Sequence, residues 1–216
     1  MARHGALVKQ GYNRAVARDV RGTPLDQLRR DQLHARDITA VLESLRQRLA
    51  DEGIAFALIG ALALRHYGYV RHTEDIDILT TPEGLERIHA RLVGRGFATR
   101  GPGLRRSLRE TEHQVDIDIV TAGEHAGSPE SPVEYPPPES GAFVDVGGWR
   151  LPTLQALVEF KIASGVWGHR VRDLADVQSL IRANGLSEAF GERLAPALRE
   201  RFLELLRESR LERALE

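Results

Sequence analysis

The sequence predicts an α+β fold, in which a mixed sheet flanked by helices is followed by a C-terminal helical subdomain. Up to about residue 121, short strand-like runs alternate with helical patterns, and beyond about residue 152 every pattern is helical. The hydrophobic fraction of 42% over 216 residues is sufficient for a packed core. We therefore expect an N-terminal, partly helical arm over residues 1–35, a core over 36–146 and the helical subdomain over 147–216.

The individual elements follow from the spacing of the apolar residues. In the N-terminal arm, Pro24 suits the first position of a short helix. Further helices are expected where apolar residues recur every three or four positions: residues 37–52, 61–67, 82–93, 154–165, 171–184 and 187–215. Strands are expected where short runs are apolar or alternate with polar residues: residues 54–59, 75–80, 97–100, 104–110 and 115–120. The run 54–59 is almost wholly apolar, which is typical of a strand buried on both faces.

Two segments between the last of these strands and the helical subdomain have a different character. Residues 123–141 are rich in Pro, Gly, Ser and Glu, which predicts a long surface loop or lid. The following segment, FVDVGGWRLP, predicts a hairpin that turns at Gly147 and Gly148. The helical subdomain is expected to begin within this hairpin region.

Composition excludes several classes of protein. The absence of cysteine excludes disulfides, Cys-ligated zinc and thiol catalysis, and it fits a cytoplasmic protein. We expect no membrane association, because the sequence has neither a signal-peptide pattern nor an uncharged apolar run of membrane-spanning length. The net charge of -1 provides no overall attraction to nucleic acid, although a local basic face is compatible with it. The histidines are not spaced for zinc, and no phosphate-binding P-loop motif is present.

Two of the predicted strands carry the candidate chemistry, because each places two aspartates on one face. The first has Asp75 and Asp77, and the second has Asp116 and Asp118. Carboxylates at this spacing can bind one hard cation. A third carboxylate from a neighbouring strand would allow two Mg²⁺ ions to hold the oxygens of a phosphoryl or nucleotidyl transfer. The alternative is that each is an amphipathic strand whose polar face lies in water.

Other residues near the first aspartate pair are candidates for binding an anion. The turn at Gly60 and Ala61 joins a strand to a helix, where free backbone N–H groups and the helix dipole favour a phosphate. Arg71 can clamp a phosphate and Thr73 can hydrogen-bond it, although Arg71 is also one of 28 arginines and could be a surface residue. Lysine is rare in this chain, which draws attention to Lys161.

These features resemble the nucleotidyltransferase superfamily, which has the fold of DNA polymerase beta. The shared order is a glycine turn, a D-x-D strand about a dozen residues later and a third aspartate on a later strand. More narrowly, the sequence is similar to the bacterial group related to AbiEii-type toxins of type IV toxin–antitoxin systems. The similarity covers about residues 38–185 and lies in four segments: IGALALRHYGYVRHTEDIDIL, DIVTAGEHAGS, LQALVEFKIASG and RVRDLADVQSLI.

The resemblance implies a role for each candidate residue. Asp75, Asp77 and Asp118 would be catalytic and would bind two Mg²⁺ ions, with Asp116 as the alternative third ligand. The NTP would be bound by the remaining candidates, which are Gly60, Ala61, Arg71, Thr73, Lys161 and Asp173.

Three positions qualify this assignment. Asp173 is expected to orient a basic residue, whereas Asp176 is interpreted as a solvated or capping group. The residue after the turn glycine is usually Ser or Gly in the family. Ala61 stands there in this sequence and offers no hydroxyl to a phosphate.

The function implied is the Mg²⁺-dependent transfer of a nucleoside monophosphate from an NTP to an acceptor hydroxyl. The resemblance favours an RNA acceptor such as tRNA, with a small molecule or a protein as alternatives, and a cognate antitoxin as protein partner. A different class of function, which Ala61 keeps open, is a catalytically silent member that binds a nucleotide or a partner. A purely structural domain is the third interpretation.

Overall fold

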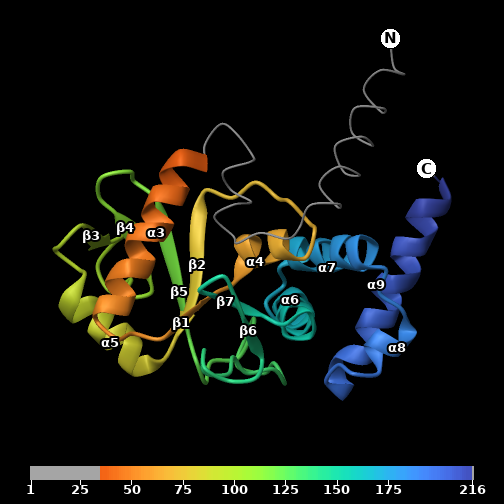
Figure 1. Cartoon of the computed structure of the whole chain (residues 1–216). Coiled ribbons are helices and arrows are strands. Elements are labelled where there is room, and N and C mark those ends of the chain that lie inside the picture. The colour runs from red at the N-terminus through yellow and green to blue at the C-terminus, as the bar shows by residue number, and fades with distance from the viewer. Residues whose placement is uncertain (1–34, 216) are drawn as a thin grey trace, which may run out of the picture.

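The computed structural model describes residues 35–215 and has a five-stranded mixed sheet with helices packed around it (Figure 1). This architecture confirms the predicted fold class. Apart from its last residue, the arm predicted over residues 1–35, with its short helix, lies outside the described part of the chain. The described helices are, in chain order, α3 (Ala35–Asp51), α4 (Gly60–His66), α5 (Pro82–Arg91), α6 (Leu154–Trp167), α7 (Val171–Asn184), α8 (Glu188–Gly191) and α9 (Pro196–Leu215).

The large sheet places the two D-x-D strands side by side. Its strand order is β1-β2-β5-β4-β3, and only β2 and β5 are parallel, while the other neighbouring pairs are antiparallel. A hairpin of β6 and β7 forms a separate two-stranded sheet. The strands are β1 (Phe56–Leu58), β2 (Asp75–Thr80), β3 (Phe97–Thr99), β4 (Ser107–Glu110), β5 (Asp116–Thr121), β6 (Phe143–Val146) and β7 (Trp149–Pro152).

Two hydrophobic cores hold the molecule together. The first lies between the sheet and helices α3 and α5, and it buries Ile76 and Ile78 of β2 with Ile117 of β5. The second joins α4 and β1 to helices α6–α9. Because side chains alternate along a strand, burial of the isoleucines under α3 and α5 turns the aspartates of β2 and β5 to the opposite face. The predicted alternation is therefore confirmed in both strands.

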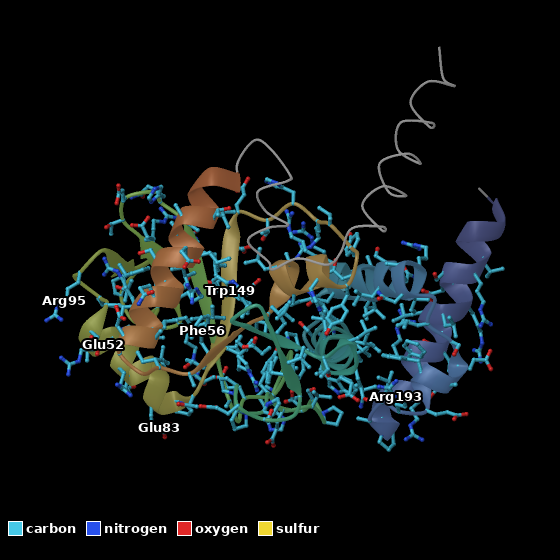
Figure 2. The ribbon with its side chains drawn as sticks, in the orientation of Figure 1. Glu52, Phe56, Glu83, Arg95, Trp149 and Arg193 are labelled. Atoms are coloured by element: carbon cyan, nitrogen blue, oxygen red, sulfur yellow. The ribbon has the colours of Figure 1, made fainter. Side chains whose placement is uncertain are left out.

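The predicted hairpin is confirmed and lies against β1. Its turn residues, Gly147 and Gly148, both have positive φ, which a two-residue hairpin turn of type I′ requires. Trp149 is buried and meets Phe56 of β1 edge-to-face, with ring centroids 6.3 Å apart. In Figure 2 Phe56 and Trp149 lie in the middle of the view, whereas the exposed residues Glu83 and Arg193 lie toward its lower edge. The predicted boundary between residues 146 and 147 falls at the tip of this hairpin and stays a prediction.

Three local predictions differ from the structure. The strand expected over residues 54–59 is only three residues long and lies at the edge of the sheet, where β7 packs beside it. The expectation that this run is buried on both faces is confirmed, because Ala57 lies in the second core and Leu58 in the first, both 0% exposed. The final helical run is interrupted, because residues 192–195 separate α8 from α9 and Pro196 begins the new helix.

The segment 123–141 is more than a surface loop. Ala126 and Val133 are buried in the second core, and the backbone of Ala126 donates a hydrogen bond to Val133. A Cβ on Gly127 would lie 2.7 Å from the backbone nitrogen of Gly168, so the segment packs closely against the end of α6. Its composition predicted irregular backbone but not these buried anchors. Within residues 35–215, every helix is too short or too polar to span a bilayer.

Candidate active site

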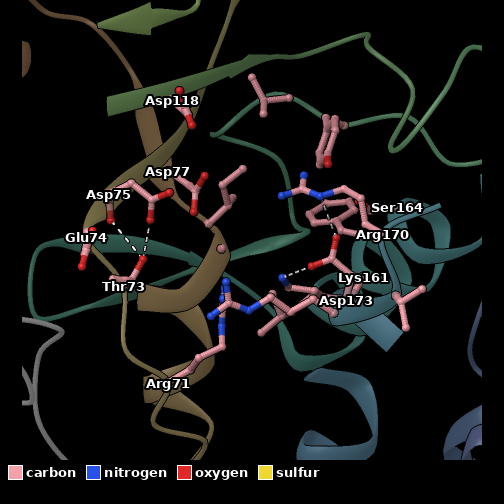
Figure 3. A pocket seen from close by; sticks show the side chains of 18 of the residues that line it. Arg71, Thr73, Glu74, Asp75, Asp77, Asp118, Lys161, Ser164, Arg170 and Asp173 are labelled. Atoms are coloured by element: carbon pink, nitrogen blue, oxygen red, sulfur yellow. Dashed lines mark hydrogen bonds and ion pairs between the residues drawn. The ribbon is translucent and has the colours of Figure 1, made fainter. Parts of the chain in front are cut away.

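Three carboxylates converge on the face of the sheet that α3 and α5 leave uncovered. Asp77 on β2 is the direct register partner of Asp118 on β5, and Asp75 lies two residues before Asp77 on the same face. One oxygen from each of Asp75, Asp77 and Asp118 lies within 4.8 Å of the others. Thr73 donates a hydrogen bond to Asp75, and Ser107 of β4 donates one to Asp118 at 2.8 Å. Figure 3 shows the three aspartates on adjoining strands.

Gly60 is required by the position of Asp77. Its φ is +62°, which favours glycine, and a Cβ at this position would lie 1.9 Å from Oδ2 of Asp77. The predicted turn therefore brings the backbone at the start of α4 against the carboxylate. Ala61 follows with its side chain almost fully buried in the interior, so at this position only the backbone remains to meet a ligand.

The electrostatic environment of Asp77 favours the arrival of a cation. Burial and then the charge of Asp75 raise the pKa of Asp77 to about 6, with a smaller effect from Asp118 and with Lys161 and Arg170 opposing the rise. A bound divalent cation would relieve the repulsion among these carboxylates. Clustered carboxylate oxygens are the donors that Mg²⁺ prefers, so the residues present fit such an ion.

The structure separates the two candidates for the third carboxylate. Asp116 forms a two-bond ion pair with Arg109, at 2.6 and 3.1 Å, and lies 3.4 Å from a nitrogen of Arg100. The hydrogen bond from Arg109 lowers the pKa of Asp116 below its usual range. Asp118 has no arginine partner among the described residues and faces Asp77 directly. The geometry therefore supports Asp118 rather than Asp116 as the third member of the cluster.

Basic residues form the opposite wall of the site. Lys161 of α6 is buried and forms an ion pair and a hydrogen bond with Asp173 of α7. Burial acts to raise the pKa of Asp173, but the charge and hydrogen bond of Lys161, together with smaller effects of Ser164 and Arg170, leave the pKa lowered. Arg170 lies 3.5 Å from the other oxygen of Asp173. The expectation that Asp173 orients a basic residue agrees with these contacts (Figure 3).

The interpretation of Asp176 as a solvated or capping group is wrong. Its side chain is 1% exposed, with Nζ of Lys161 at 2.8 Å from Oδ2 and Nε of Arg71 at 3.5 Å from Oδ1. These contacts are ion pairs, since neither oxygen has a well-directed hydrogen bond within the described residues. Asp176 faces α6 because the i to i+3 spacing from Asp173 places both carboxylates on one side of α7. It therefore holds Lys161 and Arg71 together.

The two walls enclose one cavity of about 650 Å³. Among the predicted residues, the cavity brings together Gly60, Arg71, Thr73, Asp75, Asp77, Asp118, Lys161 and Asp173, whereas Ala61, Asp116 and Asp176 do not line it. Arg71 is a cavity residue with 17% of its side chain exposed, rather than a surface arginine.

Several residues that line the cavity were not predicted from the sequence. Tyr135 comes from the segment 123–141 and packs against Phe160 of α6, with ring centroids 4.9 Å apart. Burial raises the pKa of Tyr135 to about 12, so the phenol stays protonated. No periodicity marks this residue in a Pro-rich segment. Arg170 and Ser164 also line the cavity, and the position of Arg170 three residues before Asp173 is the one signal that could have revealed it.

Comparison with known proteins identifies solved structures that share this fold. No protein-family model matches the sequence, and no curated protein matches it. The chain is similar to the solution structure of the antibiotic-resistance factor ANT(2'')-Ia, an aminoglycoside nucleotidyltransferase, with 17% identity and a TM-score of 0.52 over 80% of this chain and 97% of that chain. The chain has a nucleotidyltransferase fold.

A second solved structure has the same fold. The crystal structure of ANT(2'')-Ia in complex with adenylyl-2''-tobramycin matches 76% of this chain and 96% of its own chain, with 14% identity and a TM-score of 0.50. At such identities the likeness is one of fold. The narrower resemblance to AbiEii-type toxins stays a prediction.

Proposed function

We propose that the protein transfers a nucleoside monophosphate from an NTP to an acceptor hydroxyl and releases pyrophosphate. The observation that carries the proposal is the pairing of two walls in one cavity. Asp75, Asp77 and Asp118 stand on one side, and basic residues led by Lys161 and Arg71 stand on the other. A triphosphate with its divalent cations fits between a carboxylate cluster and such cations, because each wall neutralises one part of the complex.

Each residue then has a definite task. Asp75, Asp77 and Asp118 would hold two Mg²⁺ ions, which supply charge neutralisation at the reacting phosphate when bound. Lys161, Arg71 and Arg170 would bind phosphate oxygens, while the backbone N–H groups at Gly60 and Ala61 and the hydroxyl of Thr73 would add hydrogen bonds.

Asp118 is the residue that would activate the acceptor. It is the member of the cluster nearest to β4, and the hydrogen bond from Ser107 fixes one of its oxygens. Its remaining lone pairs can accept the proton of an acceptor hydroxyl as that oxygen attacks the α-phosphate. Asp173 and Asp176 would act through Lys161 and Arg71 by holding them in place.

Two observations support different classes of acceptor. Resemblance of the sequence to AbiEii-type toxins supports an RNA such as tRNA, together with a cognate antitoxin as partner in a cytoplasmic toxin–antitoxin system. The fold neighbour in complex with adenylyl-2''-tobramycin supports a small-molecule acceptor instead. A catalytically silent nucleotide-binding protein is the second candidate function, which Ala61 favours because it provides no hydroxyl beside Gly60.

One experiment separates these functions. The purified protein is incubated with each labelled NTP, Mg²⁺ and either total RNA or tobramycin, and label transfer and pyrophosphate release are measured. We expect transfer that is lost on Asp77→Asn and on removal of Mg²⁺. Asp51→Asn is a matched control, because Asp51 is exposed at the end of α3. Stabilisation by Mg-NTP without any transfer would instead support the silent binding protein.

A further inference from the structure

Tyr135 is held in a fixed position at the edge of the cavity. Its backbone N–H donates a hydrogen bond to the carbonyl of Glu124 at 2.8 Å, and its own carbonyl accepts one from the N–H of Gly123 at 2.8 Å. Its ring packs against Phe160 of α6. The side chain therefore needs little reordering to meet a ligand, which favours binding.

The hydroxyl of Tyr135 lies between the two walls of the cavity. Figure 3 shows Asp77 on one side of this space, and Arg170 and Asp173 on the other. The charges of all three affect the pKa of Tyr135, and the strongest of these charge effects comes from Asp173 on the basic wall. Because such effects weaken with distance, a ligand that fills the space between the walls comes within reach of this hydroxyl.

This hydroxyl also differs from the other hydroxyls that line the cavity, which belong to Thr73 and Ser164. Thr73 donates a hydrogen bond to Asp75, and Ser164 hydrogen-bonds Asp173. Within residues 35–215, the hydroxyl of Tyr135 has no hydrogen-bond partner, and its oxygen is not sealed from solvent. Burial, with a smaller effect from the charge of Asp173, raises its pKa to about 12 and keeps the proton on the oxygen. Tyr135 is thus a neutral donor that lacks an acceptor.

We propose that Tyr135 is a further substrate-binding residue, whose hydroxyl donates a hydrogen bond to a phosphate oxygen in the pyrophosphate portion of the NTP. This inference rests on the proposed function, in which the basic wall holds that portion. A hydrogen bond to a charged phosphate oxygen is stronger than one between neutral groups. Negative charge grows on the pyrophosphate as its bond to the α-phosphate breaks, so the same hydrogen bond favours its departure.

The test is the affinity for inorganic pyrophosphate with Mg²⁺ present and no nucleotide, measured by isothermal titration calorimetry on wild-type protein and on Tyr135→Phe. Tyr67→Phe is the matched control. Both tyrosines are half-buried, and the pKa of each is raised to about 12. The hydroxyl of Tyr67, however, donates to the carbonyl of Pro152 at 2.7 Å, and Tyr67 does not line the cavity.

The two variants should change opposite properties. We expect Tyr135→Phe to bind pyrophosphate roughly tenfold more weakly, because a hydrogen bond to a charged acceptor is lost. Its melting temperature without ligand should equal that of the wild type. Tyr67→Phe should keep the wild-type affinity for pyrophosphate, and its melting temperature should fall by a few degrees because a hydrogen bond within the protein is lost.

Four outcomes would overturn the inference. They are wild-type protein that binds no pyrophosphate, an affinity that is unchanged in Tyr135→Phe, an affinity that falls equally in Tyr67→Phe, and a ligand-free melting temperature that falls equally in both variants. Weaker binding of NTP alone by Tyr135→Phe would place the hydroxyl against the nucleoside instead. A protein that binds pyrophosphate through Tyr135 but transfers no label would overturn the proposed function and leave this inference standing.

Discussion

Strands β2 and β5 carry almost the same sequence, DIDIL and DIDIV, and lie parallel in register, yet they contribute differently to the site. Both aspartates of β2 line the cavity, whereas only Asp118 of β5 does, and Asp116 is instead ion-paired with Arg109 and Arg100. The cause is the neighbouring strand: β4 presents Arg109 directly opposite Asp116 and Ser107 opposite Asp118. A local motif therefore acquires its chemistry from the strand beside it.

The largest effect on label transfer is expected from substituting Asp77, and the matching substitution of Asp116 is the comparison. Asp77→Asn should abolish label transfer, by roughly a thousandfold or more, because it removes a shared metal ligand. It should also raise the melting temperature of the metal-free protein above pH 6, since an ionised Asp77 is destabilised by burial and by its neighbours. Asp116→Asn should keep transfer within about threefold, as an ion pair this exposed contributes little. Equal loss of transfer in the two variants would contradict the distinction between the strands.

Gly60→Ala tests the support beneath Asp77. The added Cβ would meet the Asp77 carboxylate, and the alanine backbone would have to keep a positive φ. We therefore expect the free energy of unfolding to fall by at least about 2 kcal/mol and the stabilisation by Mg-NTP to be lost. Gly185→Ala is the matched control, with φ of +60° and nothing within 4 Å of an added Cβ. It should lose about 1 kcal/mol or more and keep the Mg-NTP effect. Urea unfolding and melting shifts measure both quantities.

The pH dependence of cation binding should reflect Asp77. With a pKa of about 6, Asp77 is protonated at pH 5 and ionised at pH 7.5, so stabilisation by Mg-NTP should increase over this range. Because its pKa is raised on folding, the metal-free protein should lose stability as pH rises from about 4 to 6, and bound cations should restore it. Melting temperatures across pH measure both trends. A profile that is the same in Asp77→Asn would show that another group is responsible.

The smallest effect is expected from Arg109→Gln, which releases the second carboxylate of β5. The pKa of Asp116 should rise toward its ordinary value, because the Arg109 hydrogen bond is the largest cause of its lowering. Transfer should stay near the wild-type rate, since Asp116 does not line the cavity. Titration of Asp116 by NMR measures the shift. Metal binding by the freed Asp116 at the expense of Asp118, detected as transfer that survives Asp118→Asn in this background, would contradict the assignment.

Much of the fold was predictable from sequence because the alternation in β2 and β5 is strong and local. Isoleucines at every second position require a buried face, and this requirement alone turns Asp75, Asp77 and Asp118 to one side. The glycines at 147 and 148 likewise marked the hairpin. The burial of β1 on both faces was predicted correctly, whereas its short length and the buried anchors of segment 123–141 were not, because these depend on distant partners.

The sequence by itself determined the strands, their polar faces and the rare lysine at 161, because these depend on spacing along the chain. Only the tertiary structure decided that Asp118 and not Asp116 joins the cluster, that Asp176 is buried between Lys161 and Arg71, and that Tyr135 lines the cavity. The physical reason is that the charge environment of a carboxylate depends on which side chains lie within a few ångströms. In this protein those neighbours come from other strands and helices, and no spacing along the chain specifies them.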